Sequence, residues 1–254
     1  MIHAFNILII SMAILGLIVF ISLHFVTAGY GKFATKKWGP SVNNKAGWII
    51  MESPVFILML VLWLLSPNRE NIVTTIFFIF FQMHYFQRSF IFPFLLKGNS
   101  KMPLSIIAMG IIFNTINALM QGGWLFYLSP KDMYSINWLS SPQFIAGTMI
   151  FFAGMYINIS SDSVIRHLRK PGDTNHYLPQ KGMYRYVTSA NYFGEIVEWT
   201  GFAILTWSIS GAIFAWWTFA NLVPRAASIY QRYLNEFGPQ MKERKLKRVF
   251  PFIY

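Results

Sequence analysis

Seven apolar stretches, each close to the length of a membrane span, dominate this chain of 254 residues. A helix needs roughly 20 predominantly apolar residues to cross a bilayer. The stretches are residues 5–26, 47–66, 72–96, 103–128, 143–163, 189–207 and 211–230. The sequence therefore predicts an all-α, multi-pass membrane bundle of seven transmembrane helices, with residues 1–254 forming a single integral membrane domain.

Composition supports this class of protein. The chain is 55% hydrophobic and 12% charged, whereas soluble domains carry about 25% charged residues. Its net charge of +12 comes from basic residues that alternate with the apolar stretches, which indicates topology signals and anionic-lipid contacts; no nucleic-acid partner is expected. Cysteine is absent, which excludes disulfides and thiolate chemistry, and the five dispersed histidines show no metal-ligand spacing.

The basic residues also predict an orientation. Most of the 21 Lys and Arg residues follow the first, third and fifth stretches or lie in the C-terminal region. Positively charged loops stay on the cytosolic side. We therefore expect an outside N-terminus and a cytosolic C-terminus, which agrees with an odd number of spans.

Polar residues gather between positions 158 and 199. Asn158, Asp162 and Arg166 are spaced i, i+4, i+8 on one helical stripe. A second face holds Asn191, Glu195 and Glu198. Ionisable groups at membrane depth are costly and by default mark a site.

Between these two faces lies Arg169-Lys170-Pro171-Gly172, whose Pro and Gly end the preceding helix. Amides and carboxylates can hold ribose hydroxyls, and the basic pair can hold phosphates, so the set suits a nucleotide cofactor. The alternative interpretation makes the basic pair a topology signal and the acids interhelical contacts.

Two further constellations lie upstream. In the third stretch, Arg88 is a basic residue deep within a span and needs a carboxylate or a phosphate, while Tyr85 is a candidate acid or hydrogen-bond donor. His84 is expected to be structural. In the second stretch Glu52 precedes a proline, and its expected partner is the Tyr85 hydroxyl or Arg88. Its alternative role is a neutral bridge between two helices.

Taken together, these residues resemble the steroid 5α-reductase family (3-oxo-5α-steroid 4-dehydrogenases), and a bacterial homologue is favoured. The resemblance covers nearly the whole chain. Its motifs are Gly29-Tyr-Gly-Lys32, Glu52, His84-Tyr85-Phe86-x-Arg88, Asn117…Gln121-Gly122, Asn158-Ile-x-Ser-Asp162, Leu168-Arg-Lys-Pro-Gly172, Pro179-x-x-Gly182, Ser189-Ala-Asn-Tyr-Phe-Gly-Glu195-x-x-Glu-Trp199 and Pro251-Phe-Ile-Tyr254.

The resemblance implies an NADPH-dependent reductase with seven transmembrane helices, acting on the 4,5 double bond of 3-oxo steroids. It implies that Glu52 and Tyr85 are catalytic and bind the substrate ketone, with Met51 beside them. Residues 1–100 would form mainly the substrate side and 101–254 mainly the NADPH side. The implied NADPH contacts are Tyr30, Arg88, Asn158, Asp162, Arg169, Lys170, Asn191, Glu195, Arg225 and Tyr233.

This division agrees with the chemistry. Hydride addition to the β-carbon of an enone builds negative charge on its oxygen, which a Tyr donor held by a carboxyl group stabilises. Four positions depart from the family pattern. Met51 replaces a Gln of mammalian members, and Phe92, Asn99 and Ile229 replace a Tyr, an Arg and a His.

Three alternatives stay open at this point. One is a reductase of another sterol or enoyl lipid, and another is a membrane methyltransferase that uses S-adenosylmethionine. The third is a seven-helix transporter or receptor, against which the absence of an internal repeat counts. No obligate protein partner is evident. The lack of Cys and of long loops favours a bacterial cytoplasmic membrane; a eukaryotic source would mean the endoplasmic reticulum.

Overall fold

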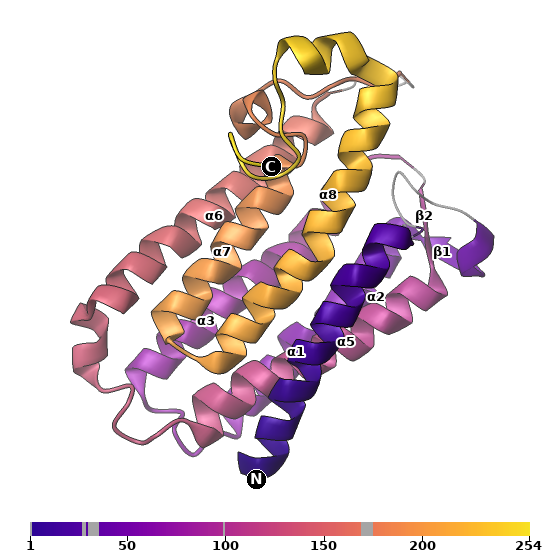
Figure 1. Ribbon diagram of the computed structural model, residues 1–254. Helices are drawn as coiled ribbons and strands as arrows, with labels where there is room; N and C mark the ends of the chain where they lie inside the picture. The colour runs from indigo at the N-terminus through magenta and orange to yellow at the C-terminus, as the bar shows by residue number, and fades with distance from the viewer. Residues whose placement is uncertain (1, 27–28, 30–35, 99, 169–174) are drawn as a thin grey trace. The chain divides into compact units, whose positions relative to one another are not determined.

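The computed structural model describes the chain except residues 1, 27–28, 30–35, 99 and 169–174 (Figure 1). Over the described residues the chain is mostly helical, and each of the seven apolar stretches contains a long helix. These helices are α1 (Ile2–Phe25), α2 (Asn44–Leu64), α3 (Ile72–Phe86), α5 (Leu104–Gly123), α6 (Pro142–Arg166), α7 (Ala190–Thr206) and α8 (Ile209–Glu243). The prediction of a mostly helical chain is confirmed, and α8 runs well beyond its predicted end.

Within the described residues, four helical stretches are long and apolar enough to cross a membrane: Ile2–Phe25, Asn44–Leu64, Leu104–Leu128 and Pro142–Arg166. The other three long helices do not combine the length and the hydropathy that a membrane span needs. Helices α3 and α7 have 15 and 17 residues, and α8 carries Asn221 and Arg225 among its apolar residues. The chain is thus a candidate multi-pass membrane protein, while the predicted orientation stays a prediction.

Short elements continue or connect these helices. A π-helix, η3 (Gln87–Ile91), and the short α4 (Phe92–Leu95) extend α3, and the π-helix η4 (Trp124–Leu128) extends α5. The remaining elements are the 3-10 helices η2 (Lys36–Trp38), η5 (Ile136–Ser140) and η6 (Gly182–Arg185), with the strands β1 (Ser41–Asn43) and β2 (Lys101–Pro103).

The chain forms two compact units. The first unit holds residues 1–11, 28–145 and 208–210, and the second holds residues 12–27, 146–207 and 211–254. Helix α5 therefore folds with the first unit, although residues 101–128 were expected mainly on the cofactor side. The functional division at residue 100 stays a prediction.

In the first unit, a small sheet sets where α2 and α5 begin. Strands β1 and β2 pair antiparallel, and each leads directly into one of the two helices. Asn43 caps α2 by accepting a hydrogen bond from the Lys45 amide at 2.9 Å. Along the helix pair, Gly110 lies against Met51 and Gly122 lies against Leu62, so α2 and α5 run parallel and pack closely.

In the second unit, α6 and α7 approach backbone to backbone and lie side by side in Figure 1. A Cβ built on Gly147 would meet the Gly201 carbonyl at 2.8 Å, and one on Gly154 would meet the Gly194 carbonyl at 2.7 Å. The glycines thus pair in antiparallel order, seven residues apart on each helix. Only glycine permits this approach, because the atoms opposite belong to backbone.

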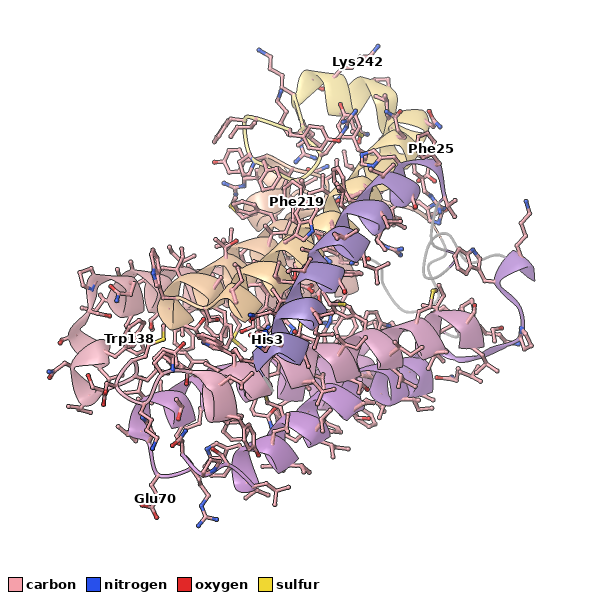
Figure 2. All side chains as sticks on the ribbon, turned by 60° about the horizontal axis from the view of Figure 1, so that its bottom comes forward. His3, Phe25, Glu70, Trp138, Phe219 and Lys242 are labelled. Atoms are coloured by element: carbon pink, nitrogen blue, oxygen red, sulfur yellow. The ribbon has the colours of Figure 1, made fainter. Side chains whose placement is uncertain are left out.

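The other contacts of the second unit hold α8 and the C-terminal segment. Trp217 of α8 donates to the Met12 carbonyl at 2.8 Å, and the ring centroids of Trp199 and Phe214 lie 4.3 Å apart. The Thr188 amide donates to the Lys247 carbonyl at 2.9 Å, which ties the segment before α7 to the end of the chain. Lys242 projects from the last turn of α8 in Figure 2.

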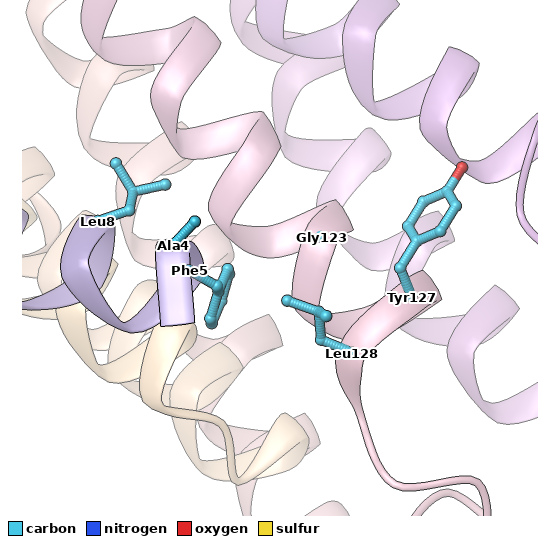
Figure 3. A pocket seen from close by; sticks show the side chains of 6 residues that line it. All are labelled: Ala4, Phe5, Leu8, Gly123, Tyr127 and Leu128. Atoms are coloured by element: carbon cyan, nitrogen blue, oxygen red, sulfur yellow. The ribbon is translucent and has the colours of Figure 1, made fainter. Parts of the chain in front are cut away.

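A small apolar hollow lies in the first unit, between the start of α1 and the end of α5 with η4 (Figure 3). Tyr127 lines it, but its hydroxyl donates to the Leu62 carbonyl at 2.9 Å. The hollow contains none of the predicted site residues. Its lining consists of Ala4, Phe5, Leu8, Gly123, Tyr127 and Leu128.

Candidate functional site

One face of α5 carries a buried ladder of amide side chains. Asn114, Asn117 and Gln121 are spaced i, i+3, i+7, so they share a helical face. Asn117 and Gln121 are fully buried and Asn114 nearly so. Because buried polar groups need hydrogen-bond partners, this face shows where the first unit places its polar contacts.

Asn114 holds the predicted catalytic acid. Its Nδ2 donates to the Met51 carbonyl at 2.8 Å and to the Glu52 Oε2 at 3.1 Å. The amide therefore binds the helix backbone and the adjacent carboxyl group together. Since both bonds come from one rigid group on α5, the Glu52 side chain is oriented by the packing of α2 against α5.

Asn117 holds the predicted catalytic phenol. Its Nδ2 donates to the Tyr85 hydroxyl oxygen at 3.1 Å. The Tyr85 ring is buried and packs against Phe81, with centroids 4.8 Å apart, and against His84 at 5.1 Å. Glu52 of α2 and Tyr85 of α3 are thus both held by the same face of a third helix, α5.

Arg88 and Met51 both contact aromatic or apolar side chains. The Arg88 guanidinium, on η3, lies 4.7 Å from the Trp48 ring centroid and 4.5 Å from that of Phe92, an arrangement that stabilises a cation by cation–π attraction. The Met51 side chain packs into the core cluster with Met102 and with two isoleucines of α5. Both residues lie beside Glu52 or Tyr85 along the chain, and their predicted ligand contacts stay predictions.

In the second unit, the two predicted polar faces come together. Asn158 Nδ2 donates to the Asn191 carbonyl at 3.0 Å and to Glu195 Oε2 at 3.4 Å. Asn191 Nδ2 donates to Asp162 Oδ1 at 3.0 Å. We call these four residues, Asn158, Asp162, Asn191 and Glu195, the amide–carboxylate cluster. It joins the C-terminal half of α6 to the first turns of α7.

Glycine packing sets the geometry of this cluster. A Cβ on Gly194 would meet the Asn158 Cα at 2.8 Å, and one on Gly154 would meet the Glu198 Cα at 2.6 Å. The two helix backbones therefore touch directly beside the cluster. This close approach lets the Asn158 side chain contact the Asn191 carbonyl. Glu198, which also lies on α7, is fully buried.

Tyr184 is a member of the site that sequence reasoning missed. Its hydroxyl donates to Asn191 Oδ1 at 3.3 Å, and its carbonyl accepts from Arg244 Nη2 at 2.9 Å. Burial raises the pKa of Tyr184 well above its usual value, and the charges of Asp162, Tyr233 and Tyr192 add to the rise. No spacing singles out this Tyr, because its contact depends on how the loop after α6 folds back.

Two of the remaining predicted cofactor contacts, Arg225 and Tyr233, lie on α8. Arg225 donates through Nε to the Tyr192 hydroxyl at 2.8 Å. Tyr233 is buried in an apolar cluster with Leu178 and Met241, where burial and then the Glu236 charge raise its pKa to about 12. The predicted contacts Tyr30, Arg169 and Lys170 lie outside the described residues.

The cluster has the chemistry of a binding site for a polar ligand. Its carboxylates accept hydrogen bonds from hydroxyl groups, and its amides both donate and accept. At the end of α6, Arg166 Nη1 is buried and has no hydrogen-bond partner among the described residues. A buried donor that makes no hydrogen bond is costly, so this atom fits a ligand that supplies an acceptor. In the described part of the chain, no group of three His, Asp or Glu side chains could hold a metal ion.

These features define a mostly helical, membrane-type chain in which one helix anchors an acid and a buried phenol and two others share an amide–carboxylate cluster. Comparison with known proteins identifies the family. Residues 100–254 match the family model described as 3-oxo-5-alpha-steroid 4-dehydrogenase.

Relatives from this family are similar to the chain over most of its length. The chain is 39% identical to 3-oxo-5-alpha-steroid 4-dehydrogenase 1 of Homo sapiens over 89% of its length and 86% of the relative. It is 35% identical to steroid 5-alpha-reductase DET2 of Gossypium hirsutum, over 98% of this chain and 97% of the relative. The chain therefore belongs to the 3-oxo-5-alpha-steroid 4-dehydrogenase family and is an oxidoreductase, as the sequence motifs predicted. The transporter and methyltransferase alternatives are not supported.

Proposed function

We propose that this chain is an NADPH-dependent reductase of the 4,5 double bond of 3-oxo-Δ4 steroids. The family and the printed names of the relatives support the substrate class. The observation that carries the proposal is the joint anchoring of Glu52 and Tyr85 on the amide face of α5. An acid and a buried phenol held on one helix face in this way suit the polarisation of a ketone.

The two side chains act where negative charge develops. Hydride addition at the β-carbon of an enone transfers electron density to the ketone oxygen, so a hydrogen bond from Tyr85 strengthens as the reaction proceeds. Glu52, held by Asn114, orients the donor and gives a second hydrogen-bonding group for the oxygen. A positioned donor of this kind accounts for about 10²–10³ in kcat, and burial of Tyr85 limits the access of competing water.

NADPH, when bound, supplies the hydride. In this proposal the amide–carboxylate cluster holds its hydroxyl and amide groups, and Arg166 Nη1 offers a buried donor for a phosphate or hydroxyl oxygen. Tyr184 keeps Asn191 in the orientation that faces Asp162. The predicted NADPH contacts outside the cluster are Tyr30, Arg88, Arg169, Lys170, Arg225 and Tyr233.

The substrate reaches the enzyme from lipid. A steroid partitions into the bilayer, and helices α1, α2 and α5 present exposed apolar side chains such as Ile10, Ile57 and Ile112. The proposed location is a bacterial cytoplasmic membrane, or the endoplasmic reticulum for a eukaryotic source. Met51, which stands where mammalian members carry Gln, makes another sterol the main competing substrate.

Purified protein in detergent or lipid tests the proposal directly. NADPH oxidation, followed by absorbance, should start only when a 3-oxo-Δ4 steroid is added, and the product should carry one new C–H bond at each end of the former double bond. Tyr85→Phe and Glu52→Gln should each abolish turnover while NADPH binding, measured by fluorescence, stays within about twofold. Full activity of both variants would show that the assigned pair is wrong.

A panel of substrates distinguishes the proposed function from a reductase of another sterol or enoyl lipid. Reduction of sterols or enoyl lipids with no reduction of 3-oxo-Δ4 steroids would keep the reductase chemistry and change the substrate. Binding of S-adenosylmethionine in preference to NADPH would overturn the reaction class.

A further inference from the structure

We propose that Asn117 and Gln121 are positioning residues that fix the Tyr85 hydroxyl as a hydrogen-bond donor. This inference rests on the proposed function, because it assigns the direction of the Tyr85 hydrogen bond in that reaction. It adds two residues that do not touch the substrate and act through Tyr85.

The arrangement begins at a backbone carbonyl. Gln121 Nε2 donates to the Ser210 carbonyl at 2.9 Å and to Asn117 Oδ1 at 3.3 Å. A carbonyl oxygen only accepts hydrogen bonds, so the Gln121 amide must turn its nitrogen toward Ser210. The two hydrogens of that nitrogen then serve the two acceptors, and the orientation of the Gln121 amide is determined.

The hydrogen bond from Gln121 determines the orientation of the Asn117 amide. With Oδ1 facing the Gln121 nitrogen, Nδ2 faces the Tyr85 hydroxyl at 3.1 Å. A flipped Asn117 amide would place two nitrogen donors against each other and lose the bond to Gln121, so the observed orientation is favoured. The Tyr85 oxygen therefore accepts from Asn117, and the hydrogen of the hydroxyl points away from Asn117. The phenol then donates to the group on its other side, which is the ketone oxygen in the proposed reaction.

The burial of Gln121 supports a role as donor. The side chain is fully buried, and its Oε1 has no hydrogen-bond partner within the described residues. An unpaired buried acceptor is costly, and an apolar side chain would avoid that cost. The position uses both hydrogens of the amide and not its oxygen, which is what a chain of aligned donors requires.

The experiment uses the full-length protein and three substitutions. Asn117→Leu keeps the size of the side chain and removes the donor, so kcat should fall by roughly 5- to 10-fold, the size of one hydrogen bond. Asn117→Asp restores a donor while the new acid is protonated, so below the pKa of that acid kcat should exceed that of Asn117→Leu. As pH rises and the acid ionises, the carboxylate takes the Tyr85 hydrogen and kcat should fall. Gln121→Met should lower kcat although it contacts no reacting group.

Gln82→Met is the matched control. Gln82 is a buried Gln of the same unit that donates to the Phe56 carbonyl at 3.1 Å, and its Oε1 also lacks a partner among the described residues. Its loss removes a similar amide but leaves the contacts of Asn117 intact, so kcat should stay near the wild-type value. NADPH affinity and thermal stability are measured for every variant to separate positioning from folding.

The outcomes distinguish the inference from the proposed function. Wild-type protein that reduces no 3-oxo-Δ4 steroid overturns the function. With an active wild type, the inference is overturned if Asn117→Leu keeps full kcat, if Asn117→Asp is as slow as Asn117→Leu at every pH, or if Gln82→Met is as slow as Gln121→Met. Rescue by Asn117→Asp supports it, because a merely structural contact has no reason to depend on the presence of a donor.

Discussion

Single amide side chains determine what the acidic and phenolic groups of this chain can do. Asn114 orients Glu52, Asn117 orients Tyr85, and Asn191 faces Asp162. An amide is a suitable group for this purpose because it both donates and accepts without carrying a charge that would be costly at membrane depth. Tyr184 extends the pattern outside the spans by orienting Asn191.

Tyr184 gives a prediction about pH. Its pKa is raised in the folded state above the ordinary 10.0, first by burial and then by neighbouring negative charge. The folded protein therefore keeps the proton that the unfolded chain releases above about pH 10. Stability should be fully present below about pH 10 and should be lost as pH rises further.

Thermal unfolding in detergent, measured from about pH 8 to about pH 11, checks this expectation. Tyr184→Phe should make the midpoint less dependent on pH in the alkaline range, because its group cannot ionise. Tyr156→Phe is the control, since Tyr156 is 73% exposed. An alkaline profile identical in wild type and Tyr184→Phe would contradict the assignment.

At the scale of elements, contacts between helix backbones position the functional groups. Glycines of α6 and α7 let the two helices touch next to the amide–carboxylate cluster. In the first unit, Gly110 and Gly122 of α5 instead leave room for the Met51 and Leu62 side chains of α2. Small residues at helix interfaces are common in membranes, where close packing replaces the hydrophobic driving force.

Substitution of the α6–α7 glycines tests this role. Gly194→Ala and Gly201→Ala each place a methyl group against backbone, so each should destabilise the protein by about 1–3 kcal/mol. Only Gly194 lies beside Asn158, so Gly194→Ala alone should also weaken NADPH binding strongly. Thermal unfolding and NADPH titration measure the two effects separately.

Gly238→Ala provides the control, because nothing lies within 4 Å of a Cβ at that position. Its stability should stay within about 0.5 kcal/mol of the wild type. Equal loss of NADPH affinity in Gly194→Ala and Gly201→Ala would show that the effect is general to the helix pair and does not act through the cluster.

At the scale of the whole molecule, the positions of the Lys and Arg residues predict how the chain is oriented in the membrane. The absence of Cys makes this orientation accessible to labelling. Glu70, between α2 and α3, and Lys242, at the end of α8, are both exposed and are labelled in Figure 2.

Single-cysteine variants should therefore react from opposite sides. In sealed cells, a membrane-impermeant maleimide should label Glu70→Cys directly and Lys242→Cys only after permeabilisation. The cysteine-free wild type is the background control. Labelling of Lys242→Cys in intact cells would reverse the predicted orientation.

Much of the fold was accessible to sequence reasoning, because span length and hydropathy are local properties. The pairing of Asn158 and Asp162 with Asn191 and Glu195 was also foreseeable from helical spacing on either side of one loop. The role of Asn114 was not, since it depends on which face of α5 meets α2. The same holds for the aromatic surroundings of Arg88, which depend on the π-helix η3 and on Trp48 from another helix.

The short β1–β2 ladder has a consequence for how this protein can evolve. It connects the starts of α2 and α5, and the Glu52–Asn114 contact depends on their register. One residue inserted between β2 and α5 would shift the helix by about 1.5 Å and turn its faces by about 100°, which moves the amide ladder away from both catalytic groups. Natural variation in length should therefore avoid this junction and accumulate at exposed loop positions such as 130–132.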